Sequence, residues 1–331
     1  MQYRYLGDTG VQVSALCMGT MTFGREADRP TAAQLYARCR DAGINFFDCA
    51  NVYAGGDSER ILGELITGHR DEVVITSKVF GQMGTDRNAR GNSRRNITSA
   101  VETSLRRLKT DRLDVYFLHG FDAATPLEET LHALDDLVTQ GKCLYIGASN
   151  FAAWQVMKAL GLSAQHGWSR FKIIQPMYNL VKRQAEVELL PLAQAEKIAV
   201  ISYSPLGGGL LTGKYGESAT ASGRFAESTN YAKRYGEGWM HQTAQDFAAF
   251  ATAHGHRPAA LAVAWVAAHP GITAPIIGAR NLAQLEDSLG ALNVPMTPDL
   301  YAEVSALTPQ PPPATDRTEE ARPAPRLQQW P

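Results

Sequence analysis

The length and composition of the chain are those of an ordinary soluble globular protein. It has 331 residues, of which 44% are hydrophobic and 20% are charged, and its formal net charge is -1. This balance excludes a basic surface that would attract nucleic acid or an anionic membrane. The first ten residues are too polar for a signal peptide, and no run reaches the ~20 apolar residues of a membrane span. We therefore expect a cytoplasmic protein that binds neither nucleic acid nor membranes.

The four cysteines, Cys17, Cys39, Cys49 and Cys143, lack the spacing of metal ligands or of a redox pair. We expect them to be reduced, and we expect no bound metal. Cys49 follows an acidic residue and would be reactive if exposed, but a small buried core residue is the more common case. We interpret Cys49 as part of the core.

Strand and helix patterns alternate along the chain. A hairpin is predicted over residues 2–13, because polar and apolar residues alternate around the turn at residues 7–10. Eight apolar runs predict strands at residues 14–18, 44–47, 73–77, 113–118, 144–148, 171–174, 198–202 and 274–277. A helical pattern follows each run, so the eight strands should be parallel.

This series predicts an α/β fold, a (β/α)8 TIM barrel over residues 1–309, with the N-terminal β-hairpin as a cap and a Pro-rich C-terminal tail over residues 310–331. An open doubly wound sheet is the alternative, but no strand is followed by the Gly-x-Gly-x-x-Gly turn that such sheets use for dinucleotides. Residues 207–242 are too long for an ordinary barrel loop. We interpret them as a lid rather than as a tolerated surface insertion.

Local signals predict where several helices begin. Thr31, Ser58 and Thr125 are predicted N-caps, with capping boxes at the two threonines. Pro258 and Asn281 are predicted to open the last two helices of the barrel. A further helix is expected over residues 186–197.

Chemically reactive side chains follow three neighbouring strands. Asp48 and Tyr53 follow the second strand, Lys78 the third and His119 the fourth. Consecutive strands of a parallel barrel lie ~4.8 Å apart, so the ends of the second and fourth strands lie about 10 Å apart. All four side chains would then face one pocket at the C-terminal rim of the barrel.

The four side chains suit proton donation to an oxygen. A phenol becomes a useful acid near neutral pH only when its pKa falls from ~10. A nearby ammonium favours the phenolate, and a carboxylate keeps that ammonium charged in a dry pocket. Tyr53, Lys78 and Asp48 supply these groups, and His119 adds a donor for a carbonyl oxygen. Each alone has an ordinary explanation as a loop cap, a solvated strand end or a core histidine, but their joint occurrence favours a site that protonates an oxygen as a hydride reaches its carbon.

The remaining strand ends suit a nicotinamide cofactor. The candidates for its carboxamide are Ser149, Asn150 and Gln175, and Tyr203 offers a flat face for its ring. Residues 204–209 would let backbone amides approach a pyrophosphate, although a flexible turn is the plainer explanation of these glycines. Arg280, near the start of the last barrel helix, suits a ribose phosphate.

Three motifs resemble the aldo-keto reductase superfamily: GINFFD (residues 43–48), YIGASNF (145–151), and YSPL (203–206) with LTGK (211–214). The likeness covers nearly the whole chain and is strongest to bacterial members related to potassium-channel β subunits and deoxysugar reductases. It implies a (β/α)8 barrel, NADPH/NADP+ as the cofactor, and Asp48, Tyr53, Lys78 and His119 as the reductase tetrad. It also implies cofactor contacts for Thr20, Asp48, Ser149, Asn150, Gln175, Tyr203, Ser204, Pro205, Leu206, Gly208, Lys214, Arg224, Gly278, Arg280, Gln284, Asp287 and Ser288.

Two positions depart from the pattern of the superfamily. Gly120 stands where an arginine often follows the tetrad histidine, and its small size would open the substrate pocket. Asp287 and Ser288 stand where Glu-Asn is usual, and the shorter carboxylate would hold the adenine end of the cofactor less firmly.

The leading hypothesis is an NADPH-dependent reductase of aldehydes or ketones with a small-molecule carbonyl substrate. A sugar or sugar-nucleotide reductase is the alternative within the same chemistry. A cofactor-sensing binding protein on the same fold is an alternative of a different class, but a sensor would not need Tyr53 as an acid. The substrate, the preferred direction and homo-oligomerisation are left open.

Overall fold

A computed structural model describes residues 1–214, 229–317, 319 and 327–328 of the chain. Eight parallel strands close into a barrel in the order β10-β3-β4-β5-β6-β7-β8-β9. They are β3 (Cys17–Gly19), β4 (Phe46–Asp48), β5 (Val74–Val79), β6 (Leu113–Leu118), β7 (Cys143–Ser149), β8 (Phe171–Gln175), β9 (Ala199–Ser202) and β10 (Ala274–Ile277). The antiparallel hairpin of β1 (Tyr3–Tyr5) and β2 (Gln12–Ser14) precedes them. The predicted (β/α)8 barrel with a hairpin is therefore confirmed.

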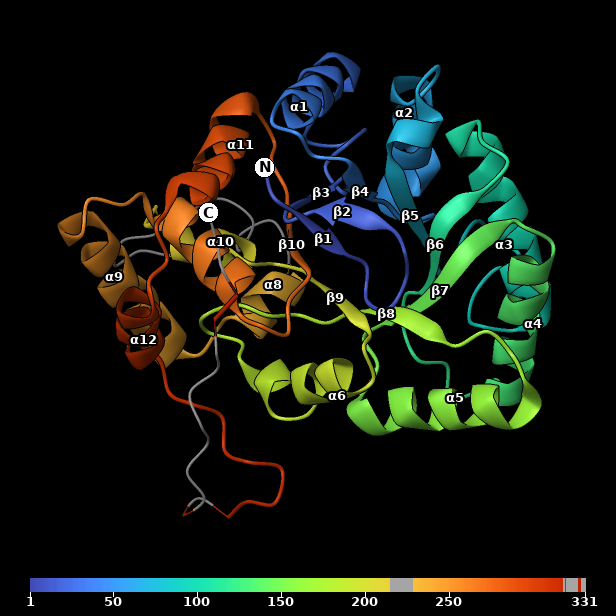
Figure 1. The fold of residues 1–331 in the computed structure, drawn as a ribbon. Helices are drawn as coiled ribbons and strands as arrows, with labels where there is room; N and C mark the ends of the chain where they lie inside the picture. The colour runs from blue at the N-terminus through green and yellow to red at the C-terminus, as the bar shows by residue number, and fades with distance from the viewer. Residues whose placement is uncertain (215–228, 318, 320–326, 329–331) are drawn as a thin grey trace.

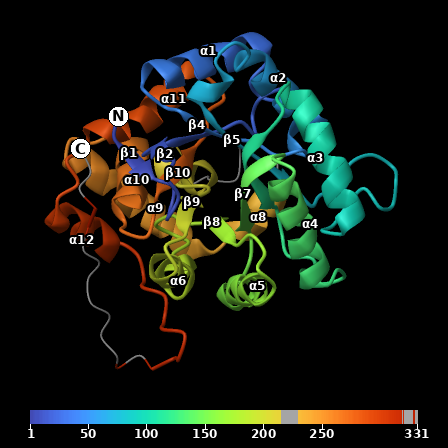
Figure 2. The same ribbon diagram turned by 45° about the vertical axis from the view of Figure 1, so that its right-hand side comes forward.

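Helices surround the barrel (Figures 1 and 2). One follows each strand: α1 (Arg29–Asp41), α2 (Asp57–Leu65), α3 (Arg94–Leu108), α4 (Leu127–Thr139), α5 (Ala153–His166), α6 (Leu189–Ala195), α10 (Pro258–Ala268) and α11 (Leu282–Leu289). Three more are α8 (Thr229–Arg234), α9 (Gly238–Ala253) and α12 (Pro298–Ala306). None of the described helices is long and apolar enough to cross a membrane.

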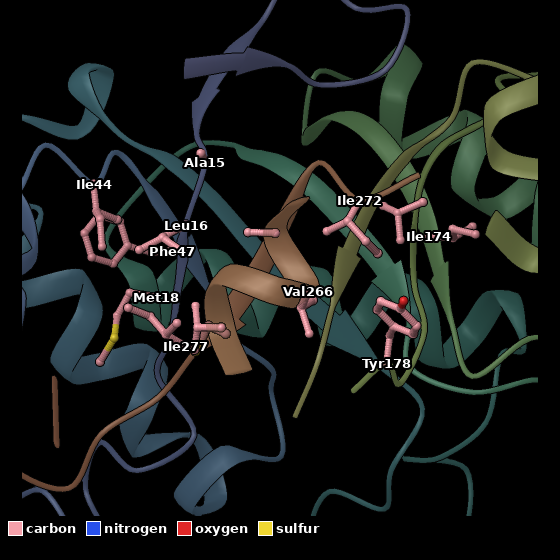
Figure 3. Close-up of a cluster of buried hydrophobic side chains, with 14 of the residues drawn as sticks. Ala15, Leu16, Met18, Ile44, Phe47, Ile174, Tyr178, Val266, Ile272 and Ile277 are labelled. Atoms are coloured by element: carbon pink, nitrogen blue, oxygen red, sulfur yellow. The ribbon is translucent and has the colours of Figure 1, made fainter. Parts of the chain in front are cut away.

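Two hydrophobic layers hold the barrel together, and consecutive residues of a strand enter different layers. Phe46 of β4 packs inside the barrel with Phe117, Ile173 and Ile201. Its neighbour Phe47 points outward into the larger layer between the strands and the helices, part of which Figure 3 shows. The side chains of consecutive strand residues point to opposite faces, so a continuous apolar run fills both layers.

The hairpin and the far end of the chain meet beneath the barrel. Arg4 Nη1 donates to the carbonyls of Ala267, Ile272 and Thr273 at 3.1, 3.0 and 3.1 Å. Gln328 Nε2 donates to the carbonyls of Pro270 and Ile272 at 2.7 and 3.3 Å. The Ile272 carbonyl is thus shared by side chains from both ends of the described chain.

Some predicted boundaries were wrong. The first barrel strand begins at Cys17 instead of residue 14, because residues 12–14 pair with β1 in the hairpin. Lys78 lies within β5 and does not follow it. The helix expected over residues 186–197 is a short 3-10 turn (Gln184–Glu186) followed by α6.

Three of the predicted helix caps were also wrong. Asp28 caps α1 by accepting from the backbone N–H of Thr31, and Thr125 donates its hydroxyl to Asp122 instead of capping α4. Ser58 lies inside α2 and donates to the carbonyl of Thr20 at 2.7 Å. Pro258 does open α10, and Asn281 caps α11 by accepting from the N–H of Gln284. Ser58 and Thr125 do not cap because each hydroxyl bonds another residue, and Thr31 is displaced by Asp28 as the cap of α1.

The predicted lid and tail lie partly outside the described residues. Of residues 207–242, the structure describes a 3-10 turn (Gly207–Thr212), α8 and the start of α9, while residues 215–228, with Arg224, are not described. Closure of this segment stays a prediction.

All four cysteines are buried, and burial raises the pKa of the Cys49 thiol to about 12, so its interpretation as a core residue is confirmed.

Candidate active site

Three adjacent strands bring the four predicted catalytic residues to one side of the rim. Asp48 ends β4, and Tyr53 begins a 3-10 turn (Tyr53–Gly56) five residues later. Lys78 lies in β5, and His119 directly follows β6. Because β4 pairs with β5 and β5 with β6 in parallel register, the side chains converge on one cluster.

A buried ion pair forms the floor of this cluster. Lys78 is fully buried, and its Nζ donates to Asp48 Oδ2 at 2.6 Å and to the Cys49 carbonyl at 2.7 Å. Asp48 Oδ1 accepts from Thr76 Oγ1 at 2.7 Å and from Gln175 Nε2 at 2.8 Å. Burial alone would lower the pKa of Lys78, but the Asp48 carboxylate raises it above its ordinary value. The ammonium therefore stays charged, and both carboxylate oxygens have partners.

Tyr53 stands above this ion pair. Its hydroxyl accepts from Lys78 Nζ at 3.4 Å, and the Nζ lies 5.0 Å from the centroid of its ring. Burial raises the pKa of Tyr53 to about 12, although the Lys78 charge lowers it. The prediction that the ammonium brings this pKa below its ordinary value was wrong, because burial has the larger effect. Tyr53 therefore keeps its proton at neutral pH, but burial makes it a weaker acid than a free phenol.

His119 adds a neutral ring beside the phenol. The ring centroids of Tyr53 and His119 lie 5.9 Å apart and the ring planes meet at 78°. Burial and, to a smaller extent, the Lys78 charge lower the pKa of His119 to about 3. A neutral imidazole carries one N–H, so His119 can donate one hydrogen bond without adding a charge.

The next strand ends bring several predicted cofactor residues together. Asn150 Nδ2 donates to the His119 carbonyl at 2.8 Å and to Ser149 Oγ at 3.1 Å. The Tyr203 hydroxyl donates to Asn150 Oδ1 at 2.7 Å, and Ser149 Oγ donates to the Gln175 carbonyl at 3.0 Å. Asn150 therefore links the cluster around Tyr53 to β9.

The segment after β9 has a left-handed backbone. Ser204 has φ 59°, and Gly207, Gly208 and Gly209 have φ 57°, 68° and 100°. A Cβ at Gly208 would lie 2.7 Å from Cδ1 of Tyr231, so only glycine fits there. Pro205 and Leu206 complete the turn, and Lys214 ends the described part of this segment.

A second group of predicted cofactor residues lies at the start of α11. The Arg280 N–H donates to Gln284 Oε1 at 3.0 Å, and Arg280 Nη2 lies 3.4 Å from Glu26 Oε1. Ser288 Oγ donates to the Gln284 carbonyl at 3.2 Å, and Asp287 forms an ion pair with Arg257. Gly278 is exposed just before Arg280.

Thr20, another predicted cofactor residue, directly follows β3 and lies beside Asp48. It is fully buried, and its hydroxyl donates to the Asp48 carbonyl at 3.1 Å.

Comparison with known proteins places the whole barrel in one family. The model of the aldo/keto reductase family matches residues 15–309. This chain belongs to the aldo/keto reductase family. The uncharacterized oxidoreductase YrpG of Bacillus subtilis (strain 168) is 35% identical over 322 residues, covering 94% of this chain and 97% of the relative.

Two further relatives show the range of names in this family. A probable voltage-gated potassium channel subunit beta of Arabidopsis thaliana is 36% identical over 302 residues, covering 89% of this chain and 92% of the relative. Norsolorinic acid reductase B of Dothistroma septosporum (strain NZE10 / CBS 128990) is 31% identical, covering 93% of this chain and 82% of the relative. The family and its oxidoreductase relatives make carbonyl reduction the general chemistry of this aldo/keto reductase.

The sequence analysis of this aldo/keto reductase missed three side chains around the cluster. Thr76 donates to Asp48, and its position two residues before Lys78 was a usable signal, because alternate strand residues share a face. Glu59 and Arg107 form an ion pair behind the Tyr53 turn. They lie 48 residues apart, so only the fold reveals their contact.

Proposed function

We propose that this aldo/keto reductase reduces an aldehyde or ketone to an alcohol with NADPH, and that Tyr53 donates the proton. The observation that carries the proposal is the geometry of the cluster: the Tyr53 hydroxyl lies 3.4 Å from the buried Lys78 ammonium that Asp48 holds, and its ring lies beside that of His119. We include a small-molecule carbonyl substrate and a cytoplasmic location in the proposal.

The side chains define a route for the proton. A carbonyl oxygen that meets Tyr53 and His119 accepts a hydrogen bond from each, which polarises its carbon. NADPH, when bound, supplies the hydride to that carbon. The proton then leaves the Tyr53 hydroxyl for the oxygen, and the Lys78 ammonium stabilises the phenolate that remains. Asp48 keeps Lys78 charged and fixed, so the phenolate has a partner at the moment it forms.

The donors along β7 to β9 fit the nicotinamide end of this cofactor. Ser149, Asn150 and Gln175 present amide and hydroxyl groups of the kind that pair with a carboxamide. Tyr203, one strand further, offers an aromatic face. Residues 204–209 are the proposed contact for the pyrophosphate, although the N–H groups of Gly207 and Gly209 donate to the carbonyls of Ser204 and Leu206 within this turn.

The start of α11 fits the ribose phosphate that distinguishes NADPH from NADH. Arg280 stands at the N-terminus of this helix, where its guanidinium and the positive end of the helix dipole both favour an anion. Gln284, Asp287 and Ser288 lie in the same helix and are the proposed contacts for the adenine end.

A substrate panel with a Tyr53→Phe variant tests the proposal. We expect the wild type to oxidise NADPH with aldehydes, ketones or sugars, followed by absorbance, and the variant to lose about 10²–10⁴ in rate. NADPH affinity of the variant, measured by fluorescence titration, should stay within a few-fold, because the hydroxyl contacts the substrate. Retention of more than about a tenth of the activity would remove Tyr53 from the mechanism.

A cofactor-sensing binding protein is the second candidate. The name of the Arabidopsis relative, a probable channel subunit, favours it. The buried Asp48–Lys78 pair beside the Tyr53 hydroxyl favours catalysis instead, because a sensor needs no proton donor. Tight NADPH binding without turnover of any carbonyl in the panel would select the sensor.

A further inference from the structure

An ion pair behind the Tyr53 turn belongs neither to the tetrad nor to the proposed cofactor residues. Glu59, in the first turn of α2, has a fully buried side chain, and that of Arg107, in the last turn of α3, is 14% exposed. Arg107 Nη1 donates to Glu59 Oε2 at 3.0 Å. A buried ion pair contributes little net stability compared with apolar side chains, so the geometry that it fixes is the more informative property.

Arg107 contacts the Tyr53 turn on both sides. Its Nη1 donates to the carbonyl of Asn51, two residues before Tyr53, at 3.3 Å. Its guanidinium also lies against Gly56, the last residue of the turn, where an added Cβ would be 2.3 Å from Arg107 Cζ. The entry and the exit of the turn therefore rest on one planar group.

Glu59 ties the same guanidinium to the strand that carries Lys78. Its Oε1 accepts from Ser77 Oγ at 2.6 Å, and Ser77 directly precedes Lys78 in β5. The chain of contacts runs from the Lys78 segment through Ser77, Glu59 and Arg107 to the segment of Tyr53. These contacts therefore fix the segment of Lys78 relative to the segment of Tyr53, and so the distance between the Lys78 ammonium and the Tyr53 hydroxyl.

The turn needs such support because its backbone is unfavourable. Ala54, Gly55 and Gly56 have φ 48°, 63° and 102°, three left-handed residues in succession. An alanine in this region is strained, so the conformation persists only where surrounding contacts impose it. The phenol begins this turn, so a shift of the turn moves its hydroxyl.

We propose that Arg107 and Glu59 are positioning residues for the reduction: through Asn51, Gly56 and Ser77 they hold the Tyr53 hydroxyl where it meets the Lys78 ammonium. The inference rests on the proposed role of Tyr53 as the proton donor. Arg107 acts on the turn from behind: its hydrogen-bond partners are the Asn51 carbonyl and the Glu59 carboxylate, not Tyr53 or Lys78 themselves.

Replacement of Arg107 tests this inference. Arg107→Ala should lower kcat by about tenfold to a hundredfold. Each tenfold loss in rate corresponds to ~1.4 kcal/mol of lost transition-state stabilisation. NADPH Kd should stay within about twofold, because the cofactor residues lie on other strands. Rates are expressed per NADPH-binding site, so loss of folded protein does not count as loss of kcat.

Matched variants separate positioning from a general structural role. Arg107→Lys keeps the charge and should restore part of kcat, because an ammonium reaches Glu59 but lacks the planar guanidinium that lies against Gly56. Arg106→Ala is the control, since Arg106 is exposed and its Nη2 donates to Thr103. If Arg107→Ala does not fold, Arg107→Ala with Glu59→Gln removes both charges and serves the same measurement.

The outcomes distinguish this inference from the proposed function. A wild-type kcat per binding site in the Arg107→Ala or double variant overturns the inference, even when Tyr53→Phe is inactive. Equal loss of kcat in Arg106→Ala and Arg107→Ala also overturns it. Full activity of Tyr53→Phe instead overturns the role of Tyr53, on which the inference rests.

Discussion

The rim of the barrel has two unlike halves. In the half formed by β4, β5 and β6, the Asp48 and Lys78 side chains are at most 2% exposed, and their hydrogen bonds are short. In the half formed by β7 to β10, Ser149 and Gln175 are also buried, but three other polar side chains are more exposed and pair with residues of other segments: Asn150 with Tyr203, Arg280 with Glu26, and Asp287 with Arg257.

The difference separates groups that must not move from groups that must exchange partners. A proton donor has its pKa and position set before the substrate arrives, which favours buried and fully paired neighbours. A cofactor groove instead presents polar groups whose present partners a ligand replaces. Perturbation of the first half should therefore affect stability and chemistry together, and perturbation of the second half should affect mainly binding.

The largest effect is expected for Lys78→Met. The variant leaves the Asp48 carboxylate buried without its ammonium, which costs about 3–5 kcal/mol of unfolding free energy, and it removes the stabilisation of the phenolate. We expect no measurable reduction of carbonyls and a lower midpoint in urea unfolding. Lys172→Met is the control, because Lys172 pairs with Asp8 at the surface and should contribute about 1 kcal/mol or less. Equal losses of activity and of unfolding free energy in the two variants would contradict the distinction between the buried and the exposed half of the rim.

A smaller and more selective effect is expected for Arg280→Ala. One charge-assisted hydrogen bond contributes ~1.5–3 kcal/mol, so NADPH affinity should fall by roughly tenfold to a hundredfold. NADH lacks the phosphate and should bind unchanged, and the urea midpoint should move little. Isothermal titration with both cofactors measures this. Equal weakening of both cofactors, or a wild type that prefers NADH, would show that Arg280 does not read the phosphate.

The smallest effect is expected from a lower pH, which should reduce the free energy of unfolding through His119 in the buried half of the rim. The pKa of His119 is lowered to about 3 in the folded chain, whereas an unfolded histidine titrates near 6.5. The unfolded state therefore binds the extra proton as the pH falls below ~6.5, and the fold loses stability until the pH reaches the folded pKa. Between pH 7 and pH 5 the wild type should lose about 2 kcal/mol more than His119→Gln. If urea unfolding gives the same change in unfolding free energy between pH 7 and pH 5 for the wild type and His119→Gln, His119 is exposed to water and its pKa is not lowered.

Much of the fold was predictable because each strand and helix carries its own pattern. The apolar runs at β6 and β10 match the observed strands residue for residue. Caps were harder, since a hydroxyl can bond a residue other than the helix start: Ser58 bonds the distant Thr20, and Thr125 bonds the preceding loop at Asp122. Local sequence shows that a hydroxyl is present but not which acceptor it bonds in the folded chain.

The catalytic cluster was predictable for a related reason. Parallel strands end at one rim, so the order of Asp48, Lys78 and His119 along the chain becomes an order in space. The raised pKa of Tyr53 was not predictable, because the sequence shows the nearby ammonium but not the extent of burial. Glu59 and Arg107 lie on two helices, where charged residues are common, and only packing distinguishes them.

The shared carbonyl of Ile272 has a consequence for synthesis on the ribosome. Arg4 is made early, yet its partner at Ile272 follows 268 residues later, roughly 15–50 s at ordinary elongation rates. During that interval β3 lacks β10 beside it, so a nascent chain presents an open strand edge of the kind that recruits other unpaired strands. Gln328 is made later still and reaches the same carbonyl. A ribosome stalled between these points would therefore hold an unclosed barrel, which is the form most in need of a chaperone.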